Sequence, residues 1–118
     1  MKKKVELKKN KKINKTQNDV SLVKRFKDKI SRKMPIVKVI LFGSRARGET
    51  REWSDYDILL VSEEFKGVVS YKRAPKIYDY WNHDYPVDFL CYTNEEFNRM
   101  KKKATIVREA VKEGIEIK

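Results

Sequence analysis

Between two apolar runs of the chain, residues 43–57 read Gly43-Ser44-Arg45-Ala46-Arg47-Gly48-Glu49-Thr50-Arg51-Glu52-Trp53-Ser54-Asp55-Tyr56-Asp57. The run before them, residues 37–42, is short and β-branched, which is typical of a strand buried on both faces. The run that begins at Asp55 has a period of two, so Asp55 and Asp57 fall on one face of a second strand. The segment therefore predicts a strand, a tight turn at Gly43 and Ser44, and a strand that carries two neighbouring carboxylates.

Helical patterns stand on either side of these strands. Apolar residues recur at helical spacing over about 19–33, with Asn18 or Asp19 as the N-cap. A second helical pattern opens at Pro75, and its Tyr78 and Trp81 are expected to cover the sheet. These patterns predict one helix before the first strand and one after the second.

The C-terminal third predicts a third strand, further helix and an edge strand. Residues 87–92 are the strand, and Thr93 and Glu96 have the spacing of a capping box that opens a helix. Gly114 is expected to end the helical region, before an edge strand at 115–117. The whole pattern indicates an α/β (α+β) fold, with a small mixed or antiparallel sheet flanked by helices.

The positive charge of the chain is concentrated near its N-terminus. The 118 residues include 29 Lys and Arg against 17 Asp and Glu, a formal net charge of +12. Residues 1–33 contain 14 basic and 3 acidic residues, a net of +11, whereas residues 34–118 contain 15 and 14, a net of +1. We expect a flexible basic arm over residues 1–17, able to bind nucleic acid or only to aid solubility, and a single domain over 18–118.

Several classes of protein are disfavoured by the composition. No apolar run approaches the ~18 residues that a membrane span requires, and lysines rather than a signal-peptide core follow Met1. We therefore expect a cytoplasmic protein with no membrane partner. Cys91 is the only cysteine, so an intrachain disulfide is excluded, and its apolar neighbours predict an inert buried thiol.

Three carboxylates and a glycine turn are the candidate chemical groups. Asp55 and Asp57 offer the hard oxygen ligands that Mg²⁺ prefers, and Asp88 on the third strand is the candidate for a third ligand. At Gly43 the backbone can approach a phosphate closely, and Ser44 adds a hydroxyl beside the backbone N–H groups. The alternative is that Asp55 and Asp57 only solvate the end of a loop.

The spacing of these residues resembles a known family. Gly43-Ser44, ten intervening residues, the Asp-x-Asp pair and a later strand aspartate resemble the nucleotidyltransferase superfamily of DNA polymerase beta. The fuller string GSRARGETREWSDYDILLV and the ending of the chain are similar to the minimal nucleotidyltransferases of archaea and bacteria. The resemblance covers about residues 36–117 and leaves out the lysine arm.

The resemblance implies a polymerase-beta-like fold and a specific role for each residue of this pattern. Asp55 and Asp57 would hold two Mg²⁺ ions, and Asp88 would join them at the ion that activates the acceptor hydroxyl. Gly43 and Ser44 would grip the β- and γ-phosphates of ATP. One ion then lowers the pKa of the attacking hydroxyl, while the other neutralises charge on the leaving pyrophosphate.

Other polar residues have open roles at this point. Arg47 is predicted to support nucleotide binding, while Arg45 and Arg47 could equally be solvated or paired with Glu49 or Glu52. His83 is expected to be structural or solvated, because no second His or Cys stands near it.

Three functions remain in competition. The first is a protein adenylyltransferase, because minimal nucleotidyltransferases commonly pair with a HEPN-domain ribonuclease and some act as antitoxins that attach AMP to it. The second keeps the chemistry but transfers to RNA or to a small hydroxylated molecule such as an aminoglycoside. The third is a binding module without turnover that grips nucleic acid or masks a toxin. Clustered carboxylates argue against the third, because they repel one another without a cation.

Overall fold

A four-stranded mixed sheet lies at the centre of the structure, a computed structural model that describes residues 2–49 and 54–118, with side chains from Thr16 onward. Its strands are β1 (Lys38–Phe42), β2 (Tyr56–Val61), β3 (Val87–Tyr92) and β4 (Ile115–Glu116), in the order β3-β2-β1-β4. β1 runs antiparallel to β2 and to β4, whereas β2 and β3 are parallel. The mixed sheet flanked by helices confirms the predicted fold class.

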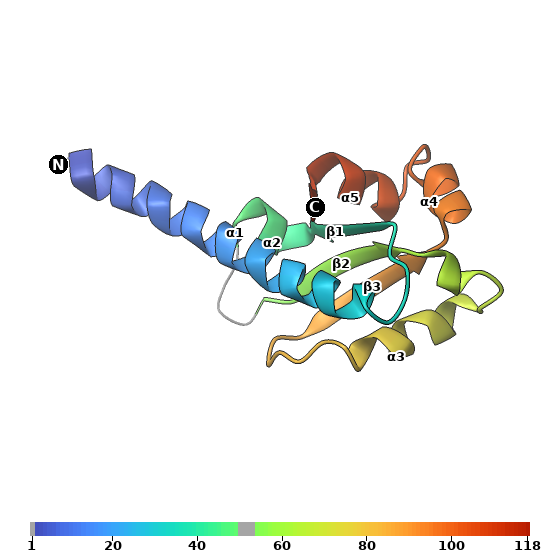
Figure 1. Ribbon diagram of the computed structural model, residues 1–118. Coiled ribbons are helices and arrows are strands. Elements are labelled where there is room, and N and C mark those ends of the chain that lie inside the picture. Colours follow the sequence, from blue (N-terminus) through green and yellow to red (C-terminus); the bar gives the residue numbers. More distant parts are fainter. Residues whose placement is uncertain (1, 50–53) are drawn as a thin grey trace.

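Helices cover both faces of this sheet. α1 (Lys2–Ser31) and α3 (Arg73–Tyr78) lie on one face, and α4 (Asn94–Met100) and α5 (Ile106–Glu113) lie on the other (Figure 1). The strand residues alternate accordingly. Ile58 and Leu60 of β2 pack with Phe26 of α1, whereas Leu59 and Val61 pack with α4 and α5. The short helices are α2 (Gly43–Arg47), η1 (Glu63–Phe65) and η2 (Ser70–Lys72).

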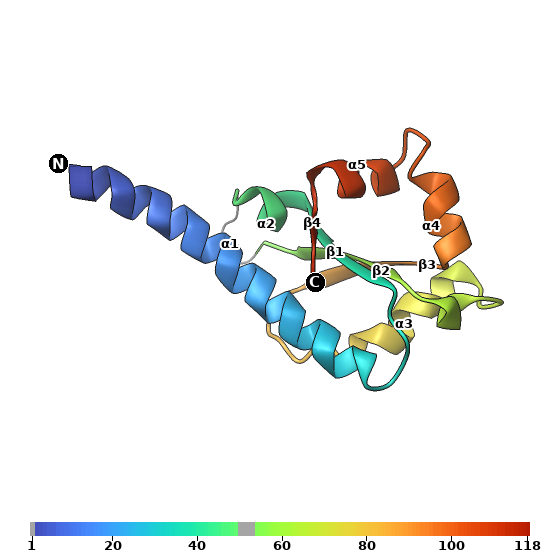
Figure 2. The same ribbon diagram turned by 45° about the horizontal axis from the view of Figure 1, so that its top comes forward.

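Helix α1 begins much earlier than the sequence pattern predicted. The structure continues it back to Lys2, so the expected start near residue 19 was wrong, and Asp19 lies inside the helix rather than at its N-cap. Lysine, glutamate, leucine and glutamine are good helix formers, and the chain contains neither Gly nor Pro before Pro35. The apolar spacing predicted only the C-terminal half of the helix, which packs on the sheet. Backbone propensity favours the extension toward the N-terminus. Its N-terminal end projects from the sheet and its covering helices in both views (Figures 1 and 2).

Two local predictions were also wrong in detail. Gly43 and Ser44 open the helix α2 rather than a tight turn, and α3 ends at Tyr78, before Trp81. Trp81 is nonetheless buried, whereas the Tyr78 side chain is 43% exposed and rests on the ring of Phe89. The capping box at Thr93 and the edge strand β4 are confirmed. Among the described residues, no helix is both long and apolar enough to cross a membrane.

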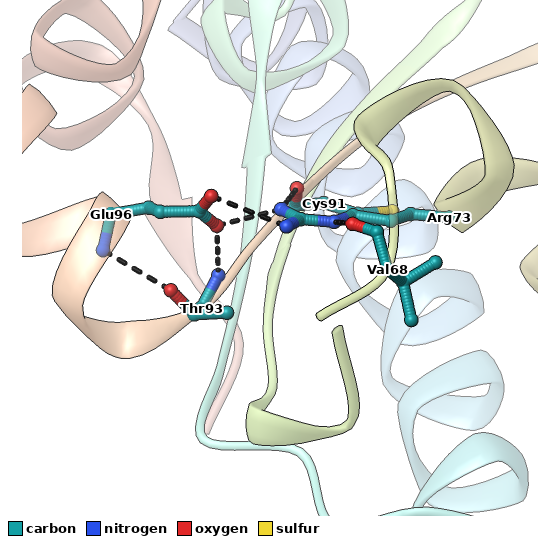
Figure 3. A network of polar contacts seen from close by, with 5 residues as sticks. All are labelled: Val68, Arg73, Cys91, Thr93 and Glu96. Atoms are coloured by element: carbon teal, nitrogen blue, oxygen red, sulfur yellow. Dashed lines mark hydrogen bonds and ion pairs between the residues drawn. The ribbon is translucent and has the colours of Figure 1, made fainter. Parts of the chain in front are cut away.

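A buried arginine ties α3 to the end of β3. Arg73 donates to Glu96 Oε1 at 2.6 Å and to the backbone oxygens of Val68 at 2.8 Å and Cys91 at 3.1 Å (Figure 3). Glu96 Oε1 also accepts from the Thr93 N–H and so completes the capping box. These bonds lower the pKa of Glu96 to about 2, chiefly through Arg73. Cys91 is buried as predicted, and burial raises the pKa of its thiol to about 12.

Glu96→Gln is expected to destabilise the fold by about 2 kcal/mol at neutral pH, because it removes a charge-assisted bond to a buried arginine. The lowered pKa of Glu96 means that its contribution is present above about pH 4.5 and is lost as the pH falls toward about 2. Urea unfolding of the wild type and the variant at pH 7 and pH 3 measures this. The difference between the two proteins should shrink at the lower pH, and a constant difference would contradict the assignment.

Candidate active site

Strand pairing brings the predicted acidic residues together. In the parallel register of β2 and β3, Asp57 stands directly opposite Asp88, and on its other side Asp57 is paired with Phe42 of β1. Asp57 shares a face of β2 with Leu59 and Val61, the face covered by α4 and α5. Two carboxylates from separate parts of the chain therefore meet where β1 ends and β2 begins.

Gly43 fits tightly against the Asp57 side chain. Its φ is +73°, a conformation that L side chains rarely adopt. A Cβ built at Gly43 would collide with the Asp57 Oδ2 atom, and its nearest neighbours all belong to Asp57. The glycine is therefore required twice, by the backbone conformation and by the close approach of the carboxylate. The start of α2 is thus in contact with the acidic group.

The electrostatics of the site favour a cation. Burial raises the pKa of Asp57, and the nearby negative charges of Asp88 and Asp55 raise it further, whereas Arg47 acts in the opposite direction. Asp55 lies just before β2, and both it and Asp88 are exposed. A metal ion between these groups would relieve their mutual repulsion.

The three carboxylates have the chemistry that a magnesium site requires, although their oxygen atoms are not close enough together to form one in this structure. In the part of the chain that the structure describes, no group of three or more His, Cys, Asp or Glu side chains has the geometry to hold a metal ion. Like charges keep such side chains apart when no cation is between them. The hard oxygens of Asp55, Asp57 and Asp88 fit Mg²⁺, which binds through a few carboxylates and keeps several waters.

Ser44 and Arg47 lie on α2, beside the acidic group. Ser44 is half-buried in the first turn, directly after the glycine that touches Asp57. The Arg47 side chain is 44% exposed and pairs with Glu49 at 3.2 Å and, more loosely, with Glu113 of α5 at 3.8 Å. Pairing with Glu49 was one of the alternatives left open by the sequence, and Glu52 lies outside the described residues. These exposed pairs are weak enough for an anionic ligand to displace them.

Arg45 does not face the solvent or the acidic group. It is 4% exposed, and its guanidinium is bonded to Asp19 of α1 and to the backbone of Ser54. The solvated alternative for Arg45 is therefore wrong, because alternate residues of the short helix α2 point to different sides of the sheet and Arg45 is on the buried side. The sequence also missed Asp19, since a single buried carboxylate within a helix leaves no periodic signal.

His83 and most of the aromatic residues of the connection between β2 and β3 have packing roles. The His83 ring lies against Trp81, with ring centres 4.8 Å apart. Burial lowers the pKa of His83, and the cations of Arg25 and Lys29 lower it further, which favours the neutral imidazole. Tyr80 and Tyr85 are half-buried against the core. The expected structural role of His83 agrees with this placement.

The fold and the residues at its acidic edge define a class of protein. A mixed sheet that carries an Asp-x-Asp strand beside a glycine-serine helix start, with a further aspartate on the parallel strand, is the arrangement expected of a nucleotidyltransferase.

Comparison with known proteins agrees with this class. The nucleotidyltransferase domain family matches residues 23–117, so the chain belongs to that family. A Haemophilus influenzae protein named "Probable protein adenylyltransferase MntA" is 27% identical over 99 residues, covering 73% of this chain and 87% of the relative. A crystal structure from Sulfolobus solfataricus, of a protein assigned to the nucleotidyltransferases, shares the fold. Its TM-score is 0.64 at 24% identity, covering 89% of this chain and 84% of that one.

Proposed function

We propose that the chain is a Mg²⁺-dependent nucleotidyltransferase that transfers AMP from ATP to a partner protein, with a HEPN-domain protein as the partner. The observation that carries the proposal is the juxtaposition of Asp57, Asp88 and Gly43 at one edge of the sheet. Family membership supports nucleotidyl transfer. The similarity to a relative named as a protein adenylyltransferase supports a protein acceptor.

Each residue of the site has a defined task in this proposal. Asp55, Asp57 and Asp88 would hold Mg²⁺, which supplies charge neutralisation and a lowered pKa for the acceptor hydroxyl. Gly43 and Ser44 would receive the β- and γ-phosphates, with Arg47 as a supporting cation. In the reaction the acceptor oxygen forms a bond to the α-phosphorus, the bond from that phosphorus to the bridging oxygen breaks, and pyrophosphate leaves. The acceptor hydroxyl loses its proton.

Labelled ATP tests this proposal. The full chain is incubated with Mg²⁺ and the purified product of the neighbouring gene, using ATP labelled at the α-phosphate in one reaction and at the γ-phosphate in another. Only the α-label should appear on the partner, and Asp55→Ala should prevent it. Absence of label with the wild type, or equal labelling by the variant, would contradict adenylyl transfer by this site. Label on the partner from the γ-phosphate would indicate phosphorylation instead.

An RNA acceptor is the second candidate, and the lysine-rich start of α1 favours it. Residues 2–17 contain eight lysines and one glutamate. The only large apolar residues in this stretch of sequence are Val5, Leu7 and Ile13, which are too few for the apolar face of a membrane-surface helix. Phosphate binding by lysines releases counterions and depends steeply on salt.

Deletion of residues 2–15 distinguishes an RNA acceptor from a protein acceptor. If RNA is the acceptor, the deletion should weaken binding of a single-stranded RNA by at least about tenfold at low salt and flatten its dependence on salt concentration. AMP transfer to a protein partner should remain within about twofold of the wild type. Fluorescence anisotropy at several salt concentrations measures the first effect. Unchanged RNA binding after the deletion would contradict a role of the lysines in acceptor binding, and absence of AMP label on RNA with the wild type would exclude the RNA acceptor.

A further inference from the structure

A buried polar cluster lies on the opposite face of β2 from the carboxylates. It consists of Asp19 of α1, Arg45 of α2 and Tyr56 of β2, whose exposed fractions are 6%, 4% and 1%. Arg45 Nη1 and the Tyr56 hydroxyl both donate to Asp19 Oδ1, at 3.0 and 2.8 Å. Burial and the bond to Asp19 raise the pKa of Tyr56, so its hydroxyl stays protonated and remains a donor.

The Arg45 guanidinium also holds the chain next to the acidic group. Its Nε and Nη2 atoms donate to the Ser54 backbone oxygen at 3.0 and 2.7 Å. Ser54 directly precedes Asp55 and lies two residues from the start of β2. Arg45 itself stands one residue after Ser44 in α2. One side chain therefore connects the helix start that would receive phosphates to the backbone that presents Asp55.

Aromatic rings fix the plane of this guanidinium. Its central carbon lies 4.0 Å from the ring centre of Tyr56 and 4.9 Å from that of Tyr85. A planar guanidinium can stack flat on a ring while it donates from fixed positions along its edges, whereas a lysine ammonium is a compact charge with no plane to stack. The cluster thus gives Arg45 a single orientation, with Asp19 as its anchor on α1.

We propose that Arg45 is a positioning residue, which holds the Gly43-Ser44 helix start and the Asp55 carboxylate at the separation needed to bind Mg²⁺ together with ATP. The proposal rests on the proposed function for the identity of the site. It adds a residue that touches neither the metal nor the nucleotide, and it assigns α1 a part in site geometry through Asp19. Groups that orient metal ligands affect metal affinity by about 10- to 100-fold.

Arg45→Lys tests this role in the full chain. The melting temperature is measured as Mg²⁺ is added in the presence of ATP, which reports binding without requiring turnover. The variant should need at least about tenfold more Mg²⁺ than the wild type for the half-maximal rise in melting temperature. AMP transfer should show a matching loss in kcat at low Mg²⁺ that excess Mg²⁺ partly restores, because the ligands are displaced and not removed.

Arg73→Lys is a matched control. Arg73 is also buried, at 6% exposure, and likewise pairs with a carboxylate and donates to backbone oxygens, but it does so at the opposite end of β3 from Asp88. We expect it to lower the melting temperature as Arg45→Lys does, while its Mg²⁺ requirement stays within about twofold of the wild type. Equal and small changes in Mg²⁺ requirement for both variants would overturn the proposal and leave Arg45 a purely stabilising role.

Asp19→Asn keeps the test decisive if Arg45→Lys does not fold. The asparagine oxygen can still accept hydrogen bonds from Arg45 and Tyr56, so the variant weakens the contact with Arg45 without removing it. It should raise the Mg²⁺ requirement by a smaller factor, about threefold, and an unchanged requirement would overturn the proposal. Failure of the proposed function gives a different result: the Mg²⁺ response of the wild type persists, but no acceptor receives AMP. A wild type without any Mg²⁺ response would overturn both.

Discussion

Asp57→Asn is expected to lower kcat for AMP transfer by at least about a thousandfold, the largest effect predicted for any substitution in this chain. The amide removes the charge of a proposed metal ligand at the point where Asp57 meets Asp88 and Gly43. Metal ions contribute several kcal/mol to stabilising charge in the transition state, and about 4 kcal/mol corresponds to a thousandfold in rate. Single-turnover transfer from α-labelled ATP measures the loss.

The same variant should be more stable than the wild type when Mg²⁺ is absent. Because the pKa of Asp57 is raised in the fold, the folded protein keeps this proton to a higher pH than the unfolded chain does. Ionised Asp57 therefore destabilises the metal-free fold, and this penalty grows as the pH rises through the pKa of the folded protein. Asparagine carries no charge, so the variant does not have this destabilisation. Adding Mg²⁺ with ATP should stabilise only the wild type, which reverses the order of the two melting temperatures.

Asp28→Asn is a suitable control, since Asp28 is an exposed carboxylate on α1 and the change removes the same charge. It should leave both the rate and the response to Mg²⁺ within about twofold of the wild type. If Asp57→Asn retained activity near that of Asp28→Asn, Asp57 would have no part in the reaction. If it were less stable than the wild type without metal, the raised pKa would be wrong.

Gly43→Ala is expected to produce the second largest effect. The methyl group would collide with Asp57 Oδ2, and alanine at a φ of +73° costs on the order of 1–3 kcal/mol in backbone strain. Relief of the collision moves either the carboxylate or the start of α2, and a displacement of about 1 Å at a reacting site can cost about a hundredfold in rate. We expect kcat/KM for ATP to fall by at least that factor, with a lower melting temperature.

Gly67→Ala distinguishes the effect of backbone strain from the effect of the collision with Asp57. Gly67 has nearly the same backbone conformation, with φ of +76°, but a Cβ there meets no heavy atom within 4 Å. The control should therefore lose stability through backbone strain alone and keep its activity within about twofold. Comparable activity losses in the two variants would show that the contact between Gly43 and Asp57 has no functional weight.

The sequence predicted the strands and the acidic group because both depend on local patterns. A period of two placed Asp55 and Asp57 on one face, and the apolar runs gave β1, β2 and β3 within a residue of their bounds. The candidate residues Gly43, Ser44 and Arg47 follow one another along α2, so their proximity needed no knowledge of the fold. The meeting of Asp57 with Asp88 depends on the order of the strands, which no local pattern specifies; the family resemblance supplied only the expected role of Asp88.

The parts that the sequence did not predict depend on long-range packing. Arg45 and Asp19 are 26 residues apart, and neither has a pattern that indicates burial. Charged residues are almost never fully buried unless they are paired, so a single arginine in a polar segment is expected to be solvated. The start of α1 was missed for a different reason, because the sequence of residues 2–17 has few apolar residues and only backbone propensity favours a helix there.

The parallel pairing of β2 with β3 also affects how relatives of this chain can diverge. Residues 62–86 leave the sheet at the end of one strand and return at the start of its neighbour, and they carry exposed side chains such as Val69 and Tyr71. Insertions or substitutions on the surface of this connection leave Asp57 opposite Asp88, so the connection can vary among relatives without moving the acidic group. A shift of β3 by one residue, in contrast, would turn Asp88 to the other face of the sheet and abolish the site.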